Sequence, residues 1–382
     1  MHFFEWLPVA IFYYILPVLI VIKWLQFIRL SSIAKNYSIP LLSSQTVFQE
    51  TVSFIVPARN EEFTIEKCLR SIMQSGYPVN QIIVVDDQSI DKTSEIVKSL
   101  QKEDVRIELV TVENLPGGWT GKNYAQFIGA LKSKSEWLIF IDSDVVISLN
   151  AVNTILVFTH EKGIDFLSIS PFQICEKYYE KLLQPEIFNL LNYLYPFNKI
   201  NTAHSKSIAA NGSFMIIKRR HYFDSGGHES VKQSILEDVA FAKKVHEKGY
   251  RVSLVHGEPI VASRMYRSFL QLWRGWSKNL YLIIKESKKN FLNILLQYVF
   301  MYLYPLIYYI IFRKLYISLL YYVIFAVLQC IMRIKNKHYF HYHIFYPFYG
   351  FIIIVLMINS YIQLSIFKRA QWKQRIYYSV KN

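Results

Sequence analysis

Three long uncharged runs near the carboxyl end place the strongest limit on how this chain can fold. Residues 291–312, 315–332 and 344–367 contain no Asp, Glu, Lys or Arg. Each approaches or exceeds the roughly 20 residues that a helix needs to cross a bilayer. Three such runs in a row, separated by basic loops, do not fit the core of a soluble domain. We therefore expect residues 291–367 to form C-terminal transmembrane helices.

A further apolar stretch, residues 7–22, lies near the amino terminus, and Lys23 and Lys35 follow it. A cleavable signal peptide carries its positive charge before the apolar run, which is the reverse of the order here. The stretch therefore predicts a transmembrane anchor over residues 1–30. Because basic flanks stay inside, we expect a multi-pass protein of the cell membrane whose central domain lies in the cytoplasm.

Basic residues are concentrated in the last third of the chain. The net charge is +15, yet residues 264–382 hold 17 Lys and Arg against a single acid, Glu286, so the first 263 residues carry a charge of −1. Such charges among apolar segments contact anionic lipid head groups and orient the helices. The near-neutral part has no basic-aromatic recognition module, so the expected partner is the lipid bilayer and not nucleic acid.

The basic tail, residues 368–382, conflicts with a simple topology. Four crossings would leave the tail outside, whereas its Lys and Arg residues favour the cytoplasmic side. One apolar segment is therefore either re-entrant or lies in the membrane interface, and the sequence leaves both alternatives open.

Residues 265–290, just before the first C-terminal run, have the pattern of an amphipathic helix. Apolar and aromatic side chains recur every three to four positions, among them Leu272, Trp273 and Trp276, and basic residues fall between them. A basic helix with aromatic anchors suits the surface of a membrane. The alternative is an ordinary helix packed on the soluble domain.

Between the anchor and this helix, residues 48–264 alternate short apolar strands with amphipathic helices. This alternation predicts an α/β domain with a mostly parallel sheet and helices on both faces. Ligands of such sheets bind beyond the carboxyl ends of the strands. The expected strands cover residues 52–57, 81–86, 106–112 and 137–142, and the expected helices cover residues 61–74, 91–100 and 122–131.

Carboxylates gather at two of these strand ends. Asp86 and Asp87 close one strand, and Asp142 and Asp144 follow another. Hard cations such as Mg²⁺ or Mn²⁺ prefer oxygen ligands and often retain phosphate oxygens, so a metal here would neutralise a departing diphosphate. The alternative is that a single Asp caps a turn or a helix. The second acidic strand end favours the metal site.

Further polar residues extend this pattern. Glu237 and Asp238 open an expected helix, where acids complement the helix dipole, but a carboxylate can also deprotonate an acceptor hydroxyl. Lys122 follows a Gly-Gly pair at a helix start, which suits either a diphosphate or a plain turn. Arg264 is suited to a phosphate, a carboxylate or a lipid head group. His256 is a candidate third metal ligand, although a single histidine is more often structural.

Four motifs of the α/β segment resemble, in order and spacing, those of family 2 glycosyltransferases with the GT-A fold: FIVPARNEE (54–62), VVDDQSIDKT (84–93), FIDSD (140–144) and LEDVAF (236–241). The resemblance implies that Asp142 and Asp144 form the D-x-D motif, with Asp144 as the direct metal ligand. It implies that Asp238 is the general base, with Glu237 beside it. The nucleotide-sugar is then expected against Pro57, Ala58, Glu61, Asp142 and either Asp86 or Asp87.

Residues 271–276 (QLWRGW) look like the Q-x-x-R-W motif of membrane-bound members, with one glycine between Arg and Trp. The resemblance places Gln271, Arg274 and Trp276 on the acceptor side, and we assign Arg264 to the same side. A narrower likeness is to the subgroup with carotenoid-acid (diaponeurosporenoate) glucosyltransferases and hopanoid-associated glycosyltransferases. It rests on PGGWTGK (116–122), GGH (226–228), RMY (264–266) and WKQRIY (372–377).

The resemblance implies an inverting, metal-dependent hexosyltransferase that moves a sugar, with glucose the expected one, from a UDP-sugar to a carotenoid acid or another membrane-resident lipid. A single acidic base requires no second carboxylate as nucleophile. A polyprenyl-phosphate glycosyltransferase stays open, because the basic segment after Arg264 suits an anionic acceptor. A processive polysaccharide synthase also stays open, although it needs a translocation channel. A catalytically inactive scaffold would be marked by loss of Asp144 or Asp238, and both are present.

Overall fold

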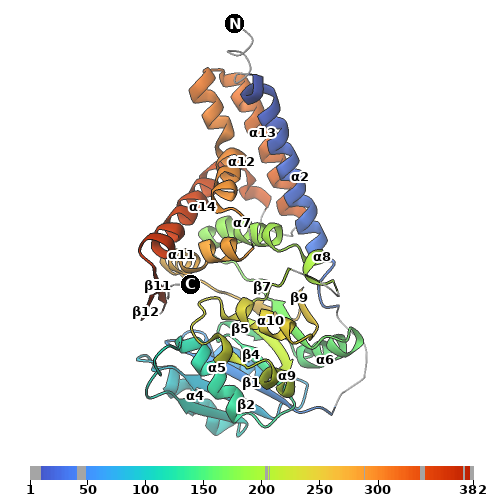
Figure 1. Cartoon of the computed structure of the whole chain (residues 1–382), viewed down its shortest axis with the longest axis vertical. Coiled ribbons are helices and arrows are strands. Elements are labelled where there is room, and N and C mark those ends of the chain that lie inside the picture. The colour runs from blue at the N-terminus through green and yellow to red at the C-terminus, as the bar shows by residue number, and fades with distance from the viewer. Residues whose placement is uncertain are drawn as a thin grey trace.

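The computed structural model describes residues 10–40, 49–202, 205, 207–287, 289–335, 340–372 and 375–378. An α/β domain forms the lower body in Figure 1, and long helices rise above it. Helices α7 (Tyr178–Leu194) and α11 (Phe269–Glu286) lie between these two parts. Parts of five expected segments lie outside the described residues: 1–9 of the anchor, 48, 203–204 and 206 of the domain, 288 of the amphipathic helix, 336–339 of the C-terminal helices, and 373–374 and 379–382 of the tail.

A seven-stranded sheet of order β3-β2-β1-β4-β8-β6-β9 forms the centre of the α/β domain. Only β8 among these strands runs against its neighbours, β4 and β6, so the sheet is mostly parallel, as predicted. Six of these strands are almost fully buried, as sheets covered on both faces require, whereas the edge strand β3 is only partly buried. They cover Val52–Ala58 (β1), Gln81–Asp86 (β2), Ile107–Thr111 (β3), Trp137–Ile141 (β4), Phe166–Ser170 (β6), Phe214–Lys218 (β8) and Val252–His256 (β9).

Helices cover both faces of this sheet. In α3 the buried side chains recur every three or four residues, the spacing from which the helix is predicted. One face packs against α3 (Ile65–Met73), α4 (Thr93–Glu103) and α6 (Ala151–Glu161). The other packs against α5 (Gly121–Lys132), α9 (Arg219–Asp224) and α10 (Glu237–Glu247), with the short helix η2 (His228–Val231) beside them.

A small second sheet, which the sequence did not predict, has the order β5-β10-β7. Its strands are β5 (Val145–Ile147), β10 (Val261–Ser263) and β7 (Phe172–Gln173). Ser263 pairs with Val145 on one side and with Gln173 on the other. The sheet therefore joins the segment that follows the D-x-D motif to the segment that leads into α7.

Four helices in the described part of the chain are long and apolar enough to cross a membrane, by length and composition. They agree with the anchor and the three C-terminal runs expected from the sequence. The first consists of η1 (Ile11–Ile15) and α2 (Leu16–Lys35), and the next two are α12 (Phe291–Phe312) and α13 (Leu315–Lys335). The last combines η3 (Phe340–Phe345), α14 (Tyr346–Tyr361) and η4 (Ile362–Ile366).

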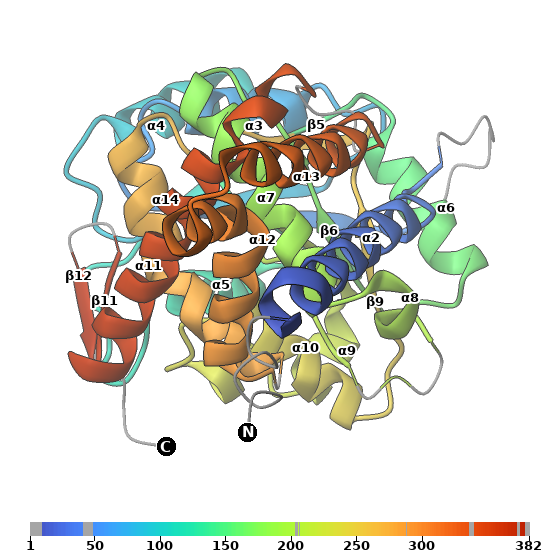
Figure 2. The ribbon, with the colours of Figure 1, turned by 90° about the horizontal axis from the view of Figure 1, so that it is seen from above.

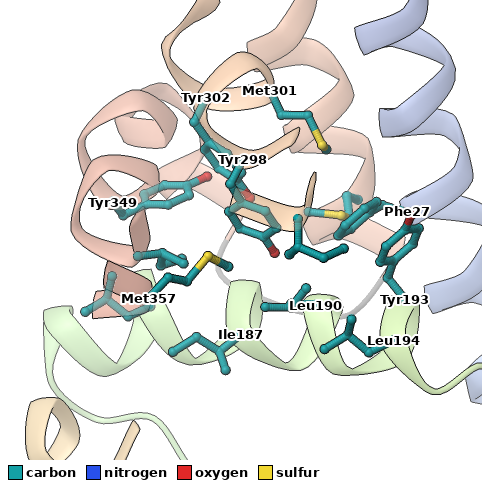
Figure 3. Packing of buried hydrophobic residues seen from close by; sticks show 14 of the residues in the cluster. Phe27, Ile187, Leu190, Tyr193, Leu194, Tyr298, Met301, Tyr302, Tyr349 and Met357 are labelled. Carbon is teal, nitrogen blue, oxygen red and sulfur yellow. The ribbon is translucent and has the colours of Figure 1, made fainter. Parts of the chain in front are cut away.

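Helix α7 packs against these long helices. Figure 3 shows Ile187 and Leu190 of α7 below Tyr298 and Met301 of α12, with aromatic side chains of α2 and α14 around them. The short α8 (Phe197–Ile200) follows α7. The described part of residues 48–264 therefore contributes to two cores, one in the sheet and one beneath the long helices.

Helix α11 also packs against the long helices through one face. Its buried side chains include Leu272, Trp276 and Leu280. The Tyr281 amide donates to Ser360 Oγ of α14 at 2.9 Å, which fixes the two helices side by side. The strands β11 (Arg369–Trp372) and β12 (Arg375–Tyr378) form an antiparallel hairpin in the basic tail.

Candidate active site

A cluster of charged side chains lies at the carboxyl end of β4. Lys122 Nζ lies 2.9 Å from Asp142 Oδ1 and 2.9 Å from Glu237 Oε1. Lys122 belongs to the first turn of α5, Asp142 follows β4, and Glu237 opens α10. Three motifs that are far apart in the sequence thus meet at one edge of the sheet, where ligands of α/β folds bind.

Asn123 fixes the position of Lys122 relative to Glu237. Its buried Nδ2 donates to the carbonyl oxygens of Val231 (2.8 Å), Lys232 (3.2 Å) and Ser234 (3.2 Å). These carbonyls belong to the loop that leads into α10. The loop is therefore fastened to the first turn of α5.

Gly212 makes room for the charged groups. A Cβ at this position would lie 3.2 Å from Asp238 Cβ, from Glu237 Oε1 and from Lys122 Nζ. The Gly212 amide also donates to Asp238 Oδ2 at 2.8 Å. A side chain at residue 212 would therefore displace the groups that form the cluster.

Asp238 has the properties of a base that works near neutral pH. Its Oδ1 accepts from the Val239 amide at 2.8 Å, and its Oδ2 accepts from Gly212. Burial, and then the negative charge of Glu237, raise the pKa of Asp238 from the ordinary 3.8 to about 6. A carboxylate with a raised pKa accepts a proton more readily than an exposed one.

The other charged groups of the cluster act on one another's pKa. Burial alone would lower the pKa of Lys122, but Asp142 and Glu237 raise it above the ordinary value. Burial raises the pKa of Asp142 against the opposing effect of Lys122. Burial alone would raise the pKa of Glu237, but the positive charges of Lys122 and Lys278 outweigh burial and lower it.

Lys278 is a member of this cluster that sequence reasoning missed. It lies on α11, and burial lowers its pKa while Glu237 and Asp238 oppose that shift. The sequence indicated only that this lysine interrupts the apolar pattern of the helix. The amphipathic helix thus carries a cation that acts on the acids of α10.

The two loops expected to form the nucleotide pocket are bound to each other. The Asp87 amide donates to Ala58 O at 2.8 Å, and the Glu61 amide donates to Thr93 Oγ1 at 2.7 Å. Pro57 and Ala58 end β1, where Ala58 pairs with Asp86, the last residue of β2, and Asp87 follows. The structure therefore brings the predicted nucleotide-binding residues together at one edge of the sheet.

Asp86 and Asp87 have different environments. Asp86 Oδ1 accepts from the Ser89 amide at 2.9 Å, and Asp86 Oδ2 accepts from Ser94 Oγ. Asp86 thus stabilises its own loop. The Asp87 carboxylate lies 3.9 Å from Arg59 Nη1.

The D-x-D motif fits a divalent cation that keeps phosphate oxygens as ligands. Asp142 and Asp144 are partly exposed and flank the buried Ser143. The described residues contain no group of three or more His, Cys, Asp and Glu side chains placed to hold a metal. Two carboxylates with open positions match a site completed by a diphosphate. The placement of His256 does not support the third-ligand hypothesis, because its ring stacks on Phe197 at 4.4 Å.

The residues expected on the acceptor side are placed in several different ways. Arg264 pairs with Glu176 (2.5 Å) and Glu180 (3.0 Å), so its charge is balanced within the protein. Trp276 is buried, and its Nε1 donates to Gln184 Oε1 of α7 at 2.9 Å. Trp276, which was expected on the acceptor side, thus packs inside the protein. Gln271 and Arg274 are exposed on α11.

The glycine within the Q-x-x-R-G-W segment has a structural reason. A Cβ on Gly275 would lie 2.4 Å from Tyr266 Oη, so the glycine lets the Tyr266 ring pack against α11. Burial, and then the charge of Asp144, raise the pKa of Tyr266, which places this phenol near the D-x-D motif. Tyr266 was noted in the sequence only as part of the RMY motif.

Comparison with known proteins agrees with this geometry. Residues 53–224 match the family model for glycosyl transferase family 2. The chain is 31% identical over 238 residues to a 4,4'-diaponeurosporenoate glycosyltransferase of Staphylococcus aureus, a match that covers 60% of this chain and 61% of that protein. A relative of the same name in Staphylococcus haemolyticus is 30% identical over 236 residues, with the same coverage. The chain thus spans about three fifths of the length of these curated relatives.

One solved structure has the same fold. A mannosyltransferase of Pyrobaculum calidifontis in complex with GDP-Man and Mn²⁺ has a TM-score of 0.55 at 17% identity, over 91% of this chain and 97% of that one. The family match, the relatives and the shared fold agree with the motifs. Residues 53–224 therefore match glycosyl transferase family 2 within a GT-A fold. In the described part of the chain, three of the four helices that are long and apolar enough to cross a membrane follow this domain.

Proposed function

We propose that this chain is an inverting hexosyltransferase that moves a hexose, with glucose the expected one, from a UDP-sugar to a membrane-resident lipid such as a carotenoid acid or another isoprenoid. The observation that carries the proposal is the meeting of Lys122, Asp142, Glu237 and Asp238 at one edge of the sheet. In Figure 1 the α/β domain lies below α11 and the long helices. The activity named for the staphylococcal relatives supports the class of acceptor.

Each residue of the cluster has a proposed role in the transfer. Asp144, with Asp142, would hold a Mg²⁺ or Mn²⁺ ion, which when bound supplies Lewis-acid assistance to the departure of UDP. Lys122 supplies an ammonium group near the diphosphate. Asp238 takes the proton from an acceptor hydroxyl as its oxygen bonds to the anomeric carbon and the bond to the diphosphate breaks. A carboxylate acceptor has no proton to lose and needs Asp238 only for orientation.

We assign three crossings to α2, α12 and α13 and a re-entrant path to α14. The lower end of α13 carries Arg333, which contacts α7. Tyr322, roughly 16 Å higher on α13 at 1.5 Å per residue, donates to Ile344 O at the start of the α14 segment. That segment ends at α11, where Asn359 Nδ2 donates to Ser277 Oγ at 2.7 Å. On this topology the catalytic domain and the basic tail share the cytoplasmic side.

The polyprenyl-phosphate alternative loses some of its support in this structure. It drew on the basic segment after Arg264 and on Arg264 as a candidate phosphate ligand. Arg264 is paired with Glu176 and Glu180, which weakens the second of these two arguments. We therefore put forward an isoprenoid acid or alcohol as the acceptor, in preference to a phosphate.

Membranes that contain the protein, incubated with a panel of UDP-hexoses, Mn²⁺ or Mg²⁺ and a lipid extract of the host, test the proposal. Mass spectrometry of the lipids identifies the sugar and the acceptor. We expect one hexosylated lipid with the wild type, none with Asp238→Asn where the acceptor is an alcohol, and an unchanged amount with the matched control Asp224→Asn, which lies exposed on α9. Equal product from wild type and Asp238→Asn would remove Asp238 from the mechanism.

A further inference from the structure

A cavity of about 100 Å³, lined by both apolar and polar side chains, lies beneath α7, on the side of α2. The lower end of α2, one face of α7, the strand β7 and the residues at the carboxyl ends of β6 and β9 line it. Figure 1 shows α7 between the long helices and the strands β7 and β9, and Figure 2 shows α2 and α11 on opposite sides of α7. None of the residues assigned above to the donor site lines this cavity.

Amide side chains supply most of the hydrogen-bonding groups of the cavity. Gln173, Gln184, Asn189 and Asn192 all line it. Gln173 Oε1 is buried and has no hydrogen-bond partner among the described residues. A buried acceptor without a donor costs free energy that a ligand can recover. Amides both donate and accept, so they match the hydroxyl or carboxyl group of a ligand.

The charged residues of the lining balance one another. Lys35 supplies one positive charge and Glu258 one negative charge. Burial lowers the pKa of His256, the remaining titratable imidazole of the lining, to about 4, so its ring is neutral at pH 7. A phosphate monoester carries about −1.5 to −2 charges at pH 7 and would find no net positive charge here. The cavity therefore suits a head group with no charge or a single charge.

The small second sheet connects this cavity to the D-x-D motif. Ser263 of β10 pairs with Val145, which directly follows Asp144, and also with Gln173 of the cavity. Neighbouring strands lie about 4.8 Å apart, so the backbones of Val145 and Gln173 are roughly 10 Å apart. This separation leaves room for the hexose of a donor between the metal site and the cavity.

The cavity also lies where a membrane lipid would approach. Ser31 and Lys35 lie at its edge, at the lower end of α2, whose upper part is apolar. Trp276 contacts two residues that line the cavity. Its Nε1 donates to Gln184 Oε1, and its ring packs edge to face against the Phe188 ring, with 6.1 Å between the ring centroids. Trp276 is therefore a positioning residue for two side chains of the lining.

We propose that this cavity receives the head group of the acceptor, an alcohol or carboxylic acid at the end of an isoprenoid chain, and discriminates against a phosphate. This inference rests on the proposed lipid glycosyltransferase function and names the acceptor class of that function. It also gives the Trp of the Q-x-x-R-G-W segment a role that requires no contact with the acceptor.

Three probes with one chain and different head groups test the cavity: geranylgeraniol, geranylgeranoic acid and geranylgeranyl phosphate. Binding of the tritiated probes to the full-length protein in nanodiscs is measured with UDP present. We expect the alcohol or the acid to bind at least tenfold more tightly than the phosphate. Gln173→Leu and Asn192→Leu remove hydrogen bonds at similar volume and weaken that binding about tenfold. The matched control Gln74→Leu, at the exposed end of α3, leaves it unchanged.

Donor binding separates this inference from the proposed function. The two cavity variants are expected to keep the wild-type affinity for UDP, because the donor loops lie elsewhere. Preferential binding of the phosphate, or probe binding that the cavity variants do not weaken, would overturn the inference while leaving lipid glycosylation intact. Absence of sugar transfer by the wild type to any host lipid would instead remove the proposed function, and probe binding would still report on the cavity.

Discussion

Replacing Asp238 by Asn is expected to stabilise the protein while it abolishes sugar transfer. The pKa of Asp238 lies at about 6 in the folded protein, against an ordinary 3.8. When the pKa of a carboxyl group is higher in the folded protein than in the unfolded chain, its ionised form is less favourable in the folded protein. Folding stability therefore falls as pH rises from about 4 to about 6, and the loss is complete at pH 7.

The size of the effect follows from two opposing contributions. A shift of about two units, at roughly 1.4 kcal/mol per unit, corresponds to about 3 kcal/mol of destabilisation by ionised Asp238 at pH 7. The Asp238 carboxylate accepts from the amides of Gly212 and Val239, and an Asn side chain can keep only one of these bonds. That loss costs about 1 kcal/mol. The net stabilisation is then about 2 kcal/mol at pH 7.

Thermal unfolding in nanodiscs, followed by tryptophan fluorescence, measures this balance. We expect Asp238→Asn to melt a few degrees above the wild type at pH 7. At pH 4 we expect it not to melt above the wild type, because Asp238 is then protonated in the folded protein and carries no charge, like the Asn side chain. Asp224→Asn, an exposed change of the same kind, is expected to shift neither value. A variant that melts below the wild type at pH 7, or a difference that does not vary with pH, would refute the reasoning about this site.

Three further predictions follow from the contacts described. Arg333 Nη2 lies 3.0 Å from Glu186 Oε1, with both side chains fully buried. Arg333→Met should therefore lower the free energy of unfolding by about 3–5 kcal/mol. Adding Glu186→Leu should restore part of that free energy, and urea unfolding in mild detergent measures both changes. Gly275→Ala places a Cβ against Tyr266 and should cost about 1–3 kcal/mol in the same assay, whereas Ser287→Ala, at the end of α11, should cost less. Chelation with EDTA should abolish transfer by the wild type, and Mn²⁺ should restore it; activity that survives chelation would contradict a metal at Asp144.

Much of the donor site could be predicted because its residues follow buried strands. Asp86, Asp87 and Asp142 lie at the carboxyl ends of parallel strands, which meet at one edge of the sheet whatever the loops do. The spacing of apolar residues likewise indicated the long helices. Backbone periodicity does not fix side-chain partners, however, so the bridge that Lys122 makes between Asp142 and Glu237 was not foreseen.

The acceptor side could not be read in the same way. The strands β5, β7 and β10 contain two or three residues each, too few for a period to be recognised. The buried apolar residues of α7 pack in the core beneath the long helices, a partner that the sequence of α7 alone did not reveal. Trp276 matches the motif by residue type. Its surroundings, in which Tyr266 packs against Gly275 and Trp276, are visible only in three dimensions and bury this part of α11.

Partition of label from UDP-[¹⁴C]glucose tests the central claim most directly. Membranes carrying the wild type or Asp144→Ala are incubated with Mn²⁺ and a host lipid extract, and the label is followed into organic solvent. The account predicts metal-dependent label in the organic phase that is absent with Asp144→Ala. Label that stays in water as an insoluble polymer would contradict it and favour a polysaccharide synthase.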